Sequence, residues 1–280
     1  MAGVYKPKED ALLTIFGRKK VVIGVIHMRP LPGSPEYTGE PVETIYQAAL
    51  QDALSYRSGG VDGLILENHG DIPFVKPDEI GHETSAVMAV AARKIRETVD
   101  LPMGINVLAN AAIPALAVAH AAGCAFIRVN QWANAYVANE GLVEGAAARA
   151  MRYRARIGAK AVRIFADAHV KHGSHAIVAD RSVPELARDV EFFAADAVIA
   201  TGQRTGDAPV IEEIQAIRSG SQLPLLVGSG VDEVNVAEIL PLVDGIIIAS
   251  ALKEEGVWWN PVSEARVRRF MEIVRVSRGD

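Results

Sequence analysis

Eight short apolar runs, separated by helical segments, constrain the fold of this chain more than any other feature of its sequence. Each run is four to eight residues long, which is too short for a helix, and is rich in Val, Ile and Leu. Near-continuous apolar strands are typical of parallel sheets whose two faces are covered by helices. The eight runs are Val21–His27, Asp62–Asn68, Met103–Leu108, Ala125–Asn130, Ala161–Asp167, Ala197–Thr201, Leu225–Gly228 and Gly245–Ser250.

Eight strand–helix units in 280 residues predict an α/β fold, a single closed (β/α)8 TIM barrel. Such barrels use about 250 residues as one domain. We therefore expect one domain over residues 1–280, in which residues 1–20 form an N-terminal extension that closes the base of the barrel. An open doubly wound sheet is the alternative, but no run is followed by the G-x-G-x-x-G of a dinucleotide-binding sheet.

The composition narrows the class of function. Hydrophobic residues make up 50% of the chain and charged residues 22%, which supports a large core and argues against disorder. The formal net charge of −5 gives no general attraction to nucleic acid, so we expect no nucleic-acid partner. Cys124 is the single cysteine, which excludes an intrachain disulfide and an all-cysteine metal site.

One uncharged stretch, Leu101–Ile127, is long enough to span a bilayer. Pro102, Asn106 and Pro114 interrupt it, so we interpret it as strand, loop, helix and strand inside a core, with no transmembrane segment. The N-terminal segment Met1–Lys20 has no continuous apolar block, so we expect no signal peptide and a cytoplasmic protein.

Polar or small residues stand at or near the carboxyl end of every one of the eight runs. In a barrel the carboxyl ends of the strands carry the chemistry, whereas a single polar residue at one strand end is commonly structural. Eight such ends together predict a functional site. We expect the residues that orient or neutralise a substrate to be Asn68, Asn106, Arg128, Asn130, Lys171 and His172.

The loops after the seventh and eighth runs predict a phosphate site. Such folds hold phosphate there through backbone amides, and glycine lets the backbone approach an anion closely. A tight turn that needs glycine is the structural alternative, and a flavin phosphate would use the same loops. The residues expected to bind phosphate are Thr201, Gly202, Gly228, Ser229, Gly230 and Ser250.

The fifth run is the best candidate for catalysis. Asp167 and His169 are two residues apart, so strand alternation puts both side chains on one face. They would act as a proton-transfer pair or as ligands of a divalent metal, with His27 and Glu67 as a second acid–base pair across the mouth. The structural alternative is an Asp–His hydrogen bond that stiffens the rim.

Other chemistries are excluded or disfavoured. The chain has no P-loop string, no His-x-His on its first run for a binuclear metal site, and no strand-borne lysine suited to a Schiff base. The proline-rich loop Met28–Pro35 and the segment Gln131–Gly141, with Trp132 and Tyr136, are candidate covers of the mouth. Trp258 and Trp259 are expected to pack a helix or an oligomer contact, and we expect a homo-oligomer.

The strings of this chain resemble the BtpA family over almost the whole length, from about Val21 to Met271. The family is similar to the ribulose-phosphate-binding barrels, and its name comes from a factor for photosystem I biogenesis. The matching strings are Gly24–His27, Pro30–Pro35, Gly60–Gly63, Glu67–Asn68, Gly70–Phe74, Asn106–Leu108, Phe126–Asn130, Asp167–His172, Gly228–Val231 and Asn260–Pro261.

Two short segments depart from the family pattern. After Leu108 the family would have Arg-Asn-Asp, whereas this chain has Ala109-Asn110-Ala111, and Asn139-Glu140 stand where the family has Asp-Gln. We expect these departures to alter substrate specificity or activity.

The expected function is therefore that of an enzyme acting on a small phosphorylated metabolite, a sugar phosphate or nucleotide-like compound. Isomerase, epimerase or lyase chemistry is favoured. The alternative is a non-catalytic assembly factor that binds a protein or a membrane complex. The structure of the barrel mouth distinguishes these two functions. A sheltered polar cavity favours the enzyme, and a mouth plugged by side chains favours the assembly factor.

Overall fold

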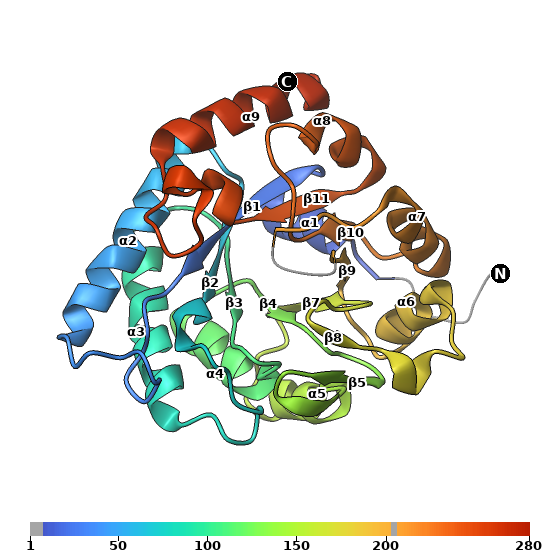
Figure 1. Cartoon of the computed structure of the whole chain (residues 1–280), viewed down its shortest axis with the longest axis horizontal. Helices are drawn as coiled ribbons and strands as arrows, with labels where there is room; N and C mark the ends of the chain where they lie inside the picture. The colour runs from blue at the N-terminus through green and yellow to red at the C-terminus, as the bar shows by residue number, and fades with distance from the viewer. Residues whose placement is uncertain (1–7, 203–205) are drawn as a thin grey trace.

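The computed structural model describes residues 8–202 and 206–280, and it confirms a closed barrel of eight parallel strands (Figure 1). Strand β1 pairs in parallel with both β2 and β11, so the sheet closes on itself. All eight predicted runs form its strands. These are β1 Val21–His27, β2 Gly63–Glu67, β3 Met103–Asn106, β4 Phe126–Val129, β7 Arg163–Asp167, β9 Ala197–Ala200, β10 Leu225–Val227 and β11 Gly245–Ile248.

Helices surround the barrel, as Figure 1 shows in the view along its axis. The α-helices are α1 Ala11–Phe16, α2 Val42–Gly59, α3 His82–Thr98, α4 Ala112–Ala122, α5 Ala147–Arg156, α6 Val183–Phe192, α7 Ile211–Gly220, α8 Val236–Ile239 and α9 Glu264–Arg278. Short 3₁₀ helices are η1 His69–Asp71, η2 Ala176–Val178, η3 Leu240–Leu242, η4 Ser250–Leu252 and η5 Glu254–Gly256.

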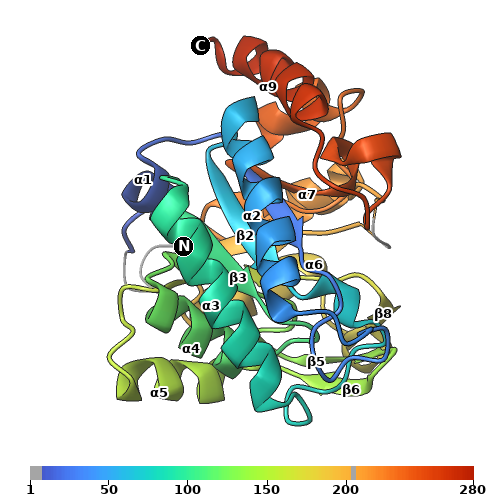
Figure 2. The ribbon, with the colours of Figure 1, turned by 90° about the vertical axis from the view of Figure 1, so that its left-hand side faces the viewer.

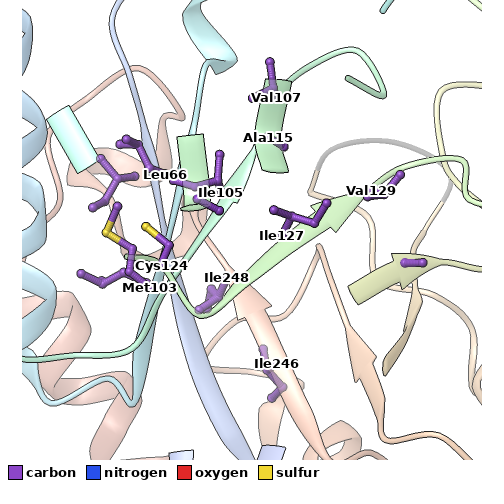
Figure 3. Packing of buried hydrophobic residues seen from close by; sticks show 14 of the residues in the cluster. Leu66, Met103, Ile105, Val107, Ala115, Cys124, Ile127, Val129, Ile246 and Ile248 are labelled. Atoms are coloured by element: carbon purple, nitrogen blue, oxygen red, sulfur yellow. The ribbon is translucent and has the colours of Figure 1, made fainter. Parts of the chain in front are cut away.

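The larger apolar core lies between the strands and the surrounding helices. Every second side chain of a strand points outward, and these residues meet the apolar faces of the helices. Figure 3 shows Leu66, Ile105 and Ile127 from neighbouring strands, with Ala115 of α4 nearby. Burial of this layer on all sides explains why the strands read as continuous apolar runs.

A second core fills the inside of the barrel. The inward residues Ile23, Ile65 and Phe165 are fully buried there, and the ring of Phe165 stacks on that of Phe126 with the centroids 4.4 Å apart. Helix α1 joins this core through Leu12 and through Phe16, whose ring contacts Phe126 at 6.0 Å. The first seven residues of the N-terminal extension lie outside the described part of the chain.

Polar residues occupy the last inward position of these strands, at the carboxyl end. On β1 the apolar residue Val25 is followed two positions later by His27, and on β2 Ile65 is followed by Glu67. The barrel interior is thus apolar below and polar at the carboxyl ends of the strands. The corresponding residues of the next three strands are Asn106, Arg128 and Asp167.

A small antiparallel sheet is present in addition to the barrel. It has the order β6-β5-β8 and consists of β5 Ala135–Ala138, β6 Gly141–Glu144 and β8 Gly173–Ser174, which follow the barrel strands β4 and β7. Figure 2 shows this sheet at one end of the barrel and α1 at the other. The residue pattern predicts a cover of the mouth in this region but not the pairing of its strands.

In the described ranges, no helix is both long enough and apolar enough to cross a membrane. The uncharged stretch Leu101–Ile127 contains β3, α4 and the start of β4, as interpreted from its prolines and polar residues.

Candidate active site

A cavity of about 600 Å³ opens at the carboxyl ends of the barrel strands. Its volume is in the range of pockets that bind metabolites. The mouth of the barrel is therefore hollow rather than plugged by side chains. Ten of the residues predicted from the sequence line it: His27, Glu67, Asn106, Arg128, Asn130, Lys171, His172, Ser229, Gly230 and Ser250.

Several predicted binding residues have structural partners instead of a place on the cavity wall. Asn68 joins the ends of β2 and β3, because its Oδ1 accepts from the Leu108 amide at 2.7 Å. The hydroxyl of Thr201 donates to the His169 carbonyl at 3.1 Å, and the Gly228 carbonyl accepts from Arg128 at 3.3 Å. Gly202 packs tightly, since a Cβ there would lie 2.1 Å from the Asp207 carbonyl oxygen.

The structure does not bring Asp167 and His169 together as a pair. Strand β7 ends at Asp167, so alternation does not continue to His169. The His169 Nδ1 instead lies 2.8 Å from a carboxylate oxygen of Glu213 on α7. Asp167 accepts two hydrogen bonds from Arg128, from Nε at 3.1 Å and from Nη2 at 3.0 Å. The geometry thus argues against a proton-transfer pair or a metal site made of these two residues.

A different acid–base cluster occupies the ends of β1 and β2. Glu67 Oε1 lies 3.1 Å from His69 Nδ1 and 3.8 Å from His27 Nε2, and the two imidazole rings stack with centroids 4.3 Å apart. Burial is the main reason that the pKa of His27 falls to about 3, so this ring is neutral at pH 7. Burial opposes ionisation of Glu67, but the His69 hydrogen bond and nearby positive charges outweigh it and hold the Glu67 pKa below its usual value.

Two asparagines present amide oxygens close to this cluster. Asn106 donates from Nδ2 to Glu67 Oε2 at 2.5 Å. Within the described part of the chain, the buried Oδ1 atoms of Asn106 and Asn130 have no hydrogen-bond partner. Buried polar atoms are nearly always satisfied, so these two oxygens, which belong to residues that line the cavity, would gain a hydrogen bond from a hydroxyl group or water.

The third group of polar side chains meets at the loops after β7 and β10. Lys171 donates from its ammonium to the Ser229 hydroxyl at 2.9 Å, and the Gly206 amide also donates to that hydroxyl at 3.3 Å. Burial, followed by the charge of Arg128, lowers the pKa of Lys171 to about 8. A cation is therefore held at the loop where such barrels bind phosphate.

Neighbouring loops complete this part of the cavity. Ser229 and Gly230 follow β10, Ser250 and Ala251 follow β11, and the two strands pair with each other. Gly230 has a φ of +81°, and a Cβ there would lie 2.0 Å from the Ala208 amide nitrogen. Glycine is therefore needed at position 230 for the turn itself. This agrees with the structural explanation of the Gly-Ser-Gly string, a tight turn that requires glycine.

The cover of the mouth differs in part from the sequence expectation. Tyr136, Asn139 and Glu140 of the segment 131–141 line the cavity, but Trp132 is fully buried and donates to the Phe193 carbonyl at 3.0 Å. The proline-rich loop after β1 does not reach the cavity wall among the described residues. Its place is taken by Ile72, Pro73 and Phe74.

His69 and Trp258 also line the site, and neither is among the site residues predicted from the sequence. His69 begins η1 directly after β2, and Trp258 lies on the wall with its ring 4.6 Å from the His69 ring. Trp258 was expected to pack a helix or an oligomer contact. The spacing of His69 two residues after Glu67 is the only sequence signal for its position.

At the positions that depart from the family pattern, Ala109, Asn139 and Glu140 line the cavity, whereas Ala111 is buried. Both departing segments thus contribute residues to the cavity wall.

Comparison with known structures confirms the fold. Phosphoribosyl anthranilate isomerase from Thermus thermophilus superposes with a TM-score of 0.54 over 91% of this chain and 98% of that chain, at 16% sequence identity. At this identity the likeness extends to the fold alone.

Comparison of sequences gives the family. An uncharacterized protein of Archaeoglobus fulgidus is 42% identical over 93% of this chain and 100% of that protein. The photosystem I biogenesis protein BtpA of Synechocystis is 34% identical over 94% of this chain and 91% of that protein. The model of the BtpA family matches residues 18–276. The chain therefore belongs to the BtpA family.

Proposed function

We propose that this protein is an enzyme that acts on a small phosphorylated metabolite, a sugar phosphate or nucleotide-like compound, by isomerase, epimerase or lyase chemistry. One observation carries the proposal. The ammonium of Lys171 is hydrogen-bonded to the Ser229 hydroxyl, beside the two loops at which (β/α)8 barrels bind phosphate, in a cavity of about 600 Å³.

The substrate phosphate would bind at Ser229, Gly230 and Ser250, with Lys171 supplying a positive charge. Glu67 is ionised at neutral pH and neighbours two imidazoles, so this cluster would supply the groups that exchange protons with the substrate. Asn106 and Asn130 would orient hydroxyl groups through their amide oxygens. Asp167 acts through Arg128 and holds it in position at the cavity wall.

The alternative function is that of a non-catalytic assembly or biogenesis factor. The name of the Synechocystis relative favours it, since that protein is described as a photosystem I biogenesis protein. The open cavity with its ionisable side chains supports the enzyme instead, because a surface that only docks a partner needs no buried carboxylate and imidazoles. The cytoplasmic location stays a prediction.

A thermal-shift screen tests the proposal. Sugar phosphates, nucleotides and flavin mononucleotide are added with and without divalent metal ions, because a ligand of the folded state raises the Tm by mass action. We expect stabilisation by a phosphorylated compound that is lost in Lys171→Met, followed by a chemical change of that compound during incubation. A screen without hits, or hits that are unaffected by Lys171→Met, would contradict the phosphate site.

A further inference from the structure

Three metal-ligating side chains converge at the ends of β1 and β2. His27 closes β1, Glu67 closes β2, and His69 opens η1. One donor atom from each lies within 4.8 Å of the other two. The cluster is distinct from Asp167 and His169, which are the residues that the sequence suggested as metal ligands.

Two of the three distances between the donor atoms are close to those around a single small ion, and the third is no longer than 4.8 Å. Bonds of about 2.0–2.2 Å around a tetrahedral Zn²⁺ place neighbouring ligand atoms about 3.3 Å apart. Glu67 Oε1 is 3.1 Å from His69 Nδ1 and 3.8 Å from His27 Nε2, which brackets that value. The two imidazole rings stack with an interplanar angle of 17°, so one ring must rotate about its side-chain torsions before both nitrogen lone pairs point at one ion.

Hydrogen bonds around the cluster orient its donors. His27 Nδ1 lies 3.1 Å from the Trp258 carbonyl, which can only accept, so this nitrogen carries a proton and leaves the Nε2 lone pair facing Glu67. Asn106 donates to Glu67 Oε2 and leaves Oε1 for the two imidazoles. A ligating imidazole typically donates its other N–H to a carbonyl or carboxylate, and a ligating carboxylate is typically hydrogen-bonded.

The free side of the cluster faces the cavity. His27, Glu67 and His69 all belong to the cavity wall, together with Asn106. The Oδ1 of Asn106 is buried and has no hydrogen-bond partner among the described residues. Three protein ligands with an open position are the arrangement of a catalytic metal, whereas a structural zinc site has four.

We propose that His27, Glu67 and His69 bind one divalent transition-metal ion whose open coordination positions face the cavity. Two imidazoles and a carboxylate suit Zn²⁺, Fe²⁺ or Co²⁺ better than Mg²⁺ or Ca²⁺, which prefer oxygen ligands. A simple hydrogen bond between Glu67 and His69 explains their contact, but not the convergence of His27 Nε2 on the same carboxylate oxygen.

The role of the ion rests on the proposed function, whereas its binding does not. A bound ion would polarise an oxygen of a metabolite whose phosphate is held at Ser229. Zinc binding in the absence of any phosphorylated compound tests the ion site, and sulfate binding by the metal-free protein tests the phosphate site. A negative result for one site therefore does not count against the other site.

The experiment titrates Zn²⁺ into the full chain, freed of any affinity tag and of metal, and measures the stoichiometry by calorimetry. Co²⁺ is then titrated as a coloured probe of coordination number. We expect one ion per chain and a visible Co²⁺ spectrum of four- or five-coordinate type. Co²⁺ should also quench the fluorescence of Trp258, whose ring lies against His69, and Trp258→Phe should bind the ion with little quenching.

Substitutions locate the ion. Glu67→Gln keeps the size of the side chain, and His69→Ala removes a partly exposed ring, so both should fold. Each should weaken Zn²⁺ binding by about 100-fold or more, since loss of an outer partner alone costs 10–100-fold. The matched control is His169→Ala, which removes the imidazole of another His–Glu pair, with a contact of 2.8 Å to Glu213. It should bind Zn²⁺ like the unaltered protein.

Two results would overturn the proposal. One is the absence of stoichiometric Zn²⁺ binding by the unaltered protein at about 100 µM, which would leave the cluster as a hydrogen-bonded group. The other is binding that survives Glu67→Gln and His69→Ala but is lost in His169→Ala, which would place the ion at β7.

Discussion

Arg128 and Asp167 form a buried bidentate ion pair across the neighbouring strands β4 and β7, with N–O distances of 3.1 and 3.0 Å. Burial raises the pKa of Asp167, and the charge of Arg128 opposes that rise. A bidentate pair of this kind fixes both side chains. Asp167 thus holds the guanidinium at the cavity wall, a task for which its side chain need not touch the substrate.

Asp167→Asn should destabilise the fold by about 3 kcal/mol, because it leaves the buried Arg128 charge without its partner. Urea unfolding measures the loss. Asp78→Asn is the matched control, since Asp78 also accepts two hydrogen bonds from one arginine, Arg149, but on the surface. Its effect should be at most about 0.5 kcal/mol. Equal losses in the two variants would show that burial of the pair has no bearing on stability.

Anion binding should weaken as the pH rises above about 8. The Lys171 ammonium, whose pKa is lowered to about 8, is charged below that pH and neutral above it. A bound anion favours the charged form, so the loss in the complex falls at somewhat higher pH. Calorimetric titration of sulfate, which keeps its charge over this range, from pH 6.5 to 9.5 measures the effect. Lys171→Arg should remove the pH dependence, and a flat profile for the unaltered protein would exclude Lys171 from the anion site.

Ser229→Asp should abolish sulfate and phosphate binding. The new carboxylate would neutralise Lys171 and repel the anion from the loop after β10. Ser229→Ala is the control, because it removes only a neutral hydrogen bond, and it should weaken binding by less than about tenfold. If Ser229→Asp binds sulfate with unchanged affinity, the anion lies elsewhere.

Strand alternation made much of this site predictable from the sequence. His27, Glu67, Asn106 and Arg128 each occupy the last inward position of a strand whose earlier inward residues are apolar. A period of two suffices to place such residues on the cavity wall, once eight apolar runs have indicated a closed barrel.

Alternation gives no guidance beyond the strand end, and two histidines show why. His69 follows Glu67, and His169 follows Asp167, at the same spacing of two. After β2 the chain enters η1, which keeps His69 beside Glu67, whereas after β7 it bends and His169 contacts Glu213. Loop contacts decide between the two outcomes. The Lys171–Ser229 hydrogen bond is also a contact between loops, and it joins residues 58 positions apart, so strand alternation could not predict it.

Homo-oligomerisation through the C-terminal region stays a prediction. Trp258 lies at the cavity, which leaves Trp259, 69% exposed, as the aromatic residue available for a contact, and Val276 of α9 is also highly exposed. Exposed apolar residues of this size are common at subunit interfaces. Light scattering at micromolar concentration should show a dimer or larger assembly that Trp259→Lys weakens. A monomeric mass for the unaltered protein would contradict this prediction.

Closure of the base of the barrel by helix α1 stays a prediction, and two adjacent leucines test it. Leu12 is fully buried in the inner core with Ile23 and Phe126, whereas Leu13 is 48% exposed. Leu12→Ala should lower the free energy of unfolding by about 3 kcal/mol, because it leaves a cavity that the barrel cannot fill. Leu13→Ala, in the same helix, should change it by about 0.5 kcal/mol or less. Urea unfolding of both variants gives the comparison. Similar, small effects would show that α1 is dispensable and that the strands close the base without it.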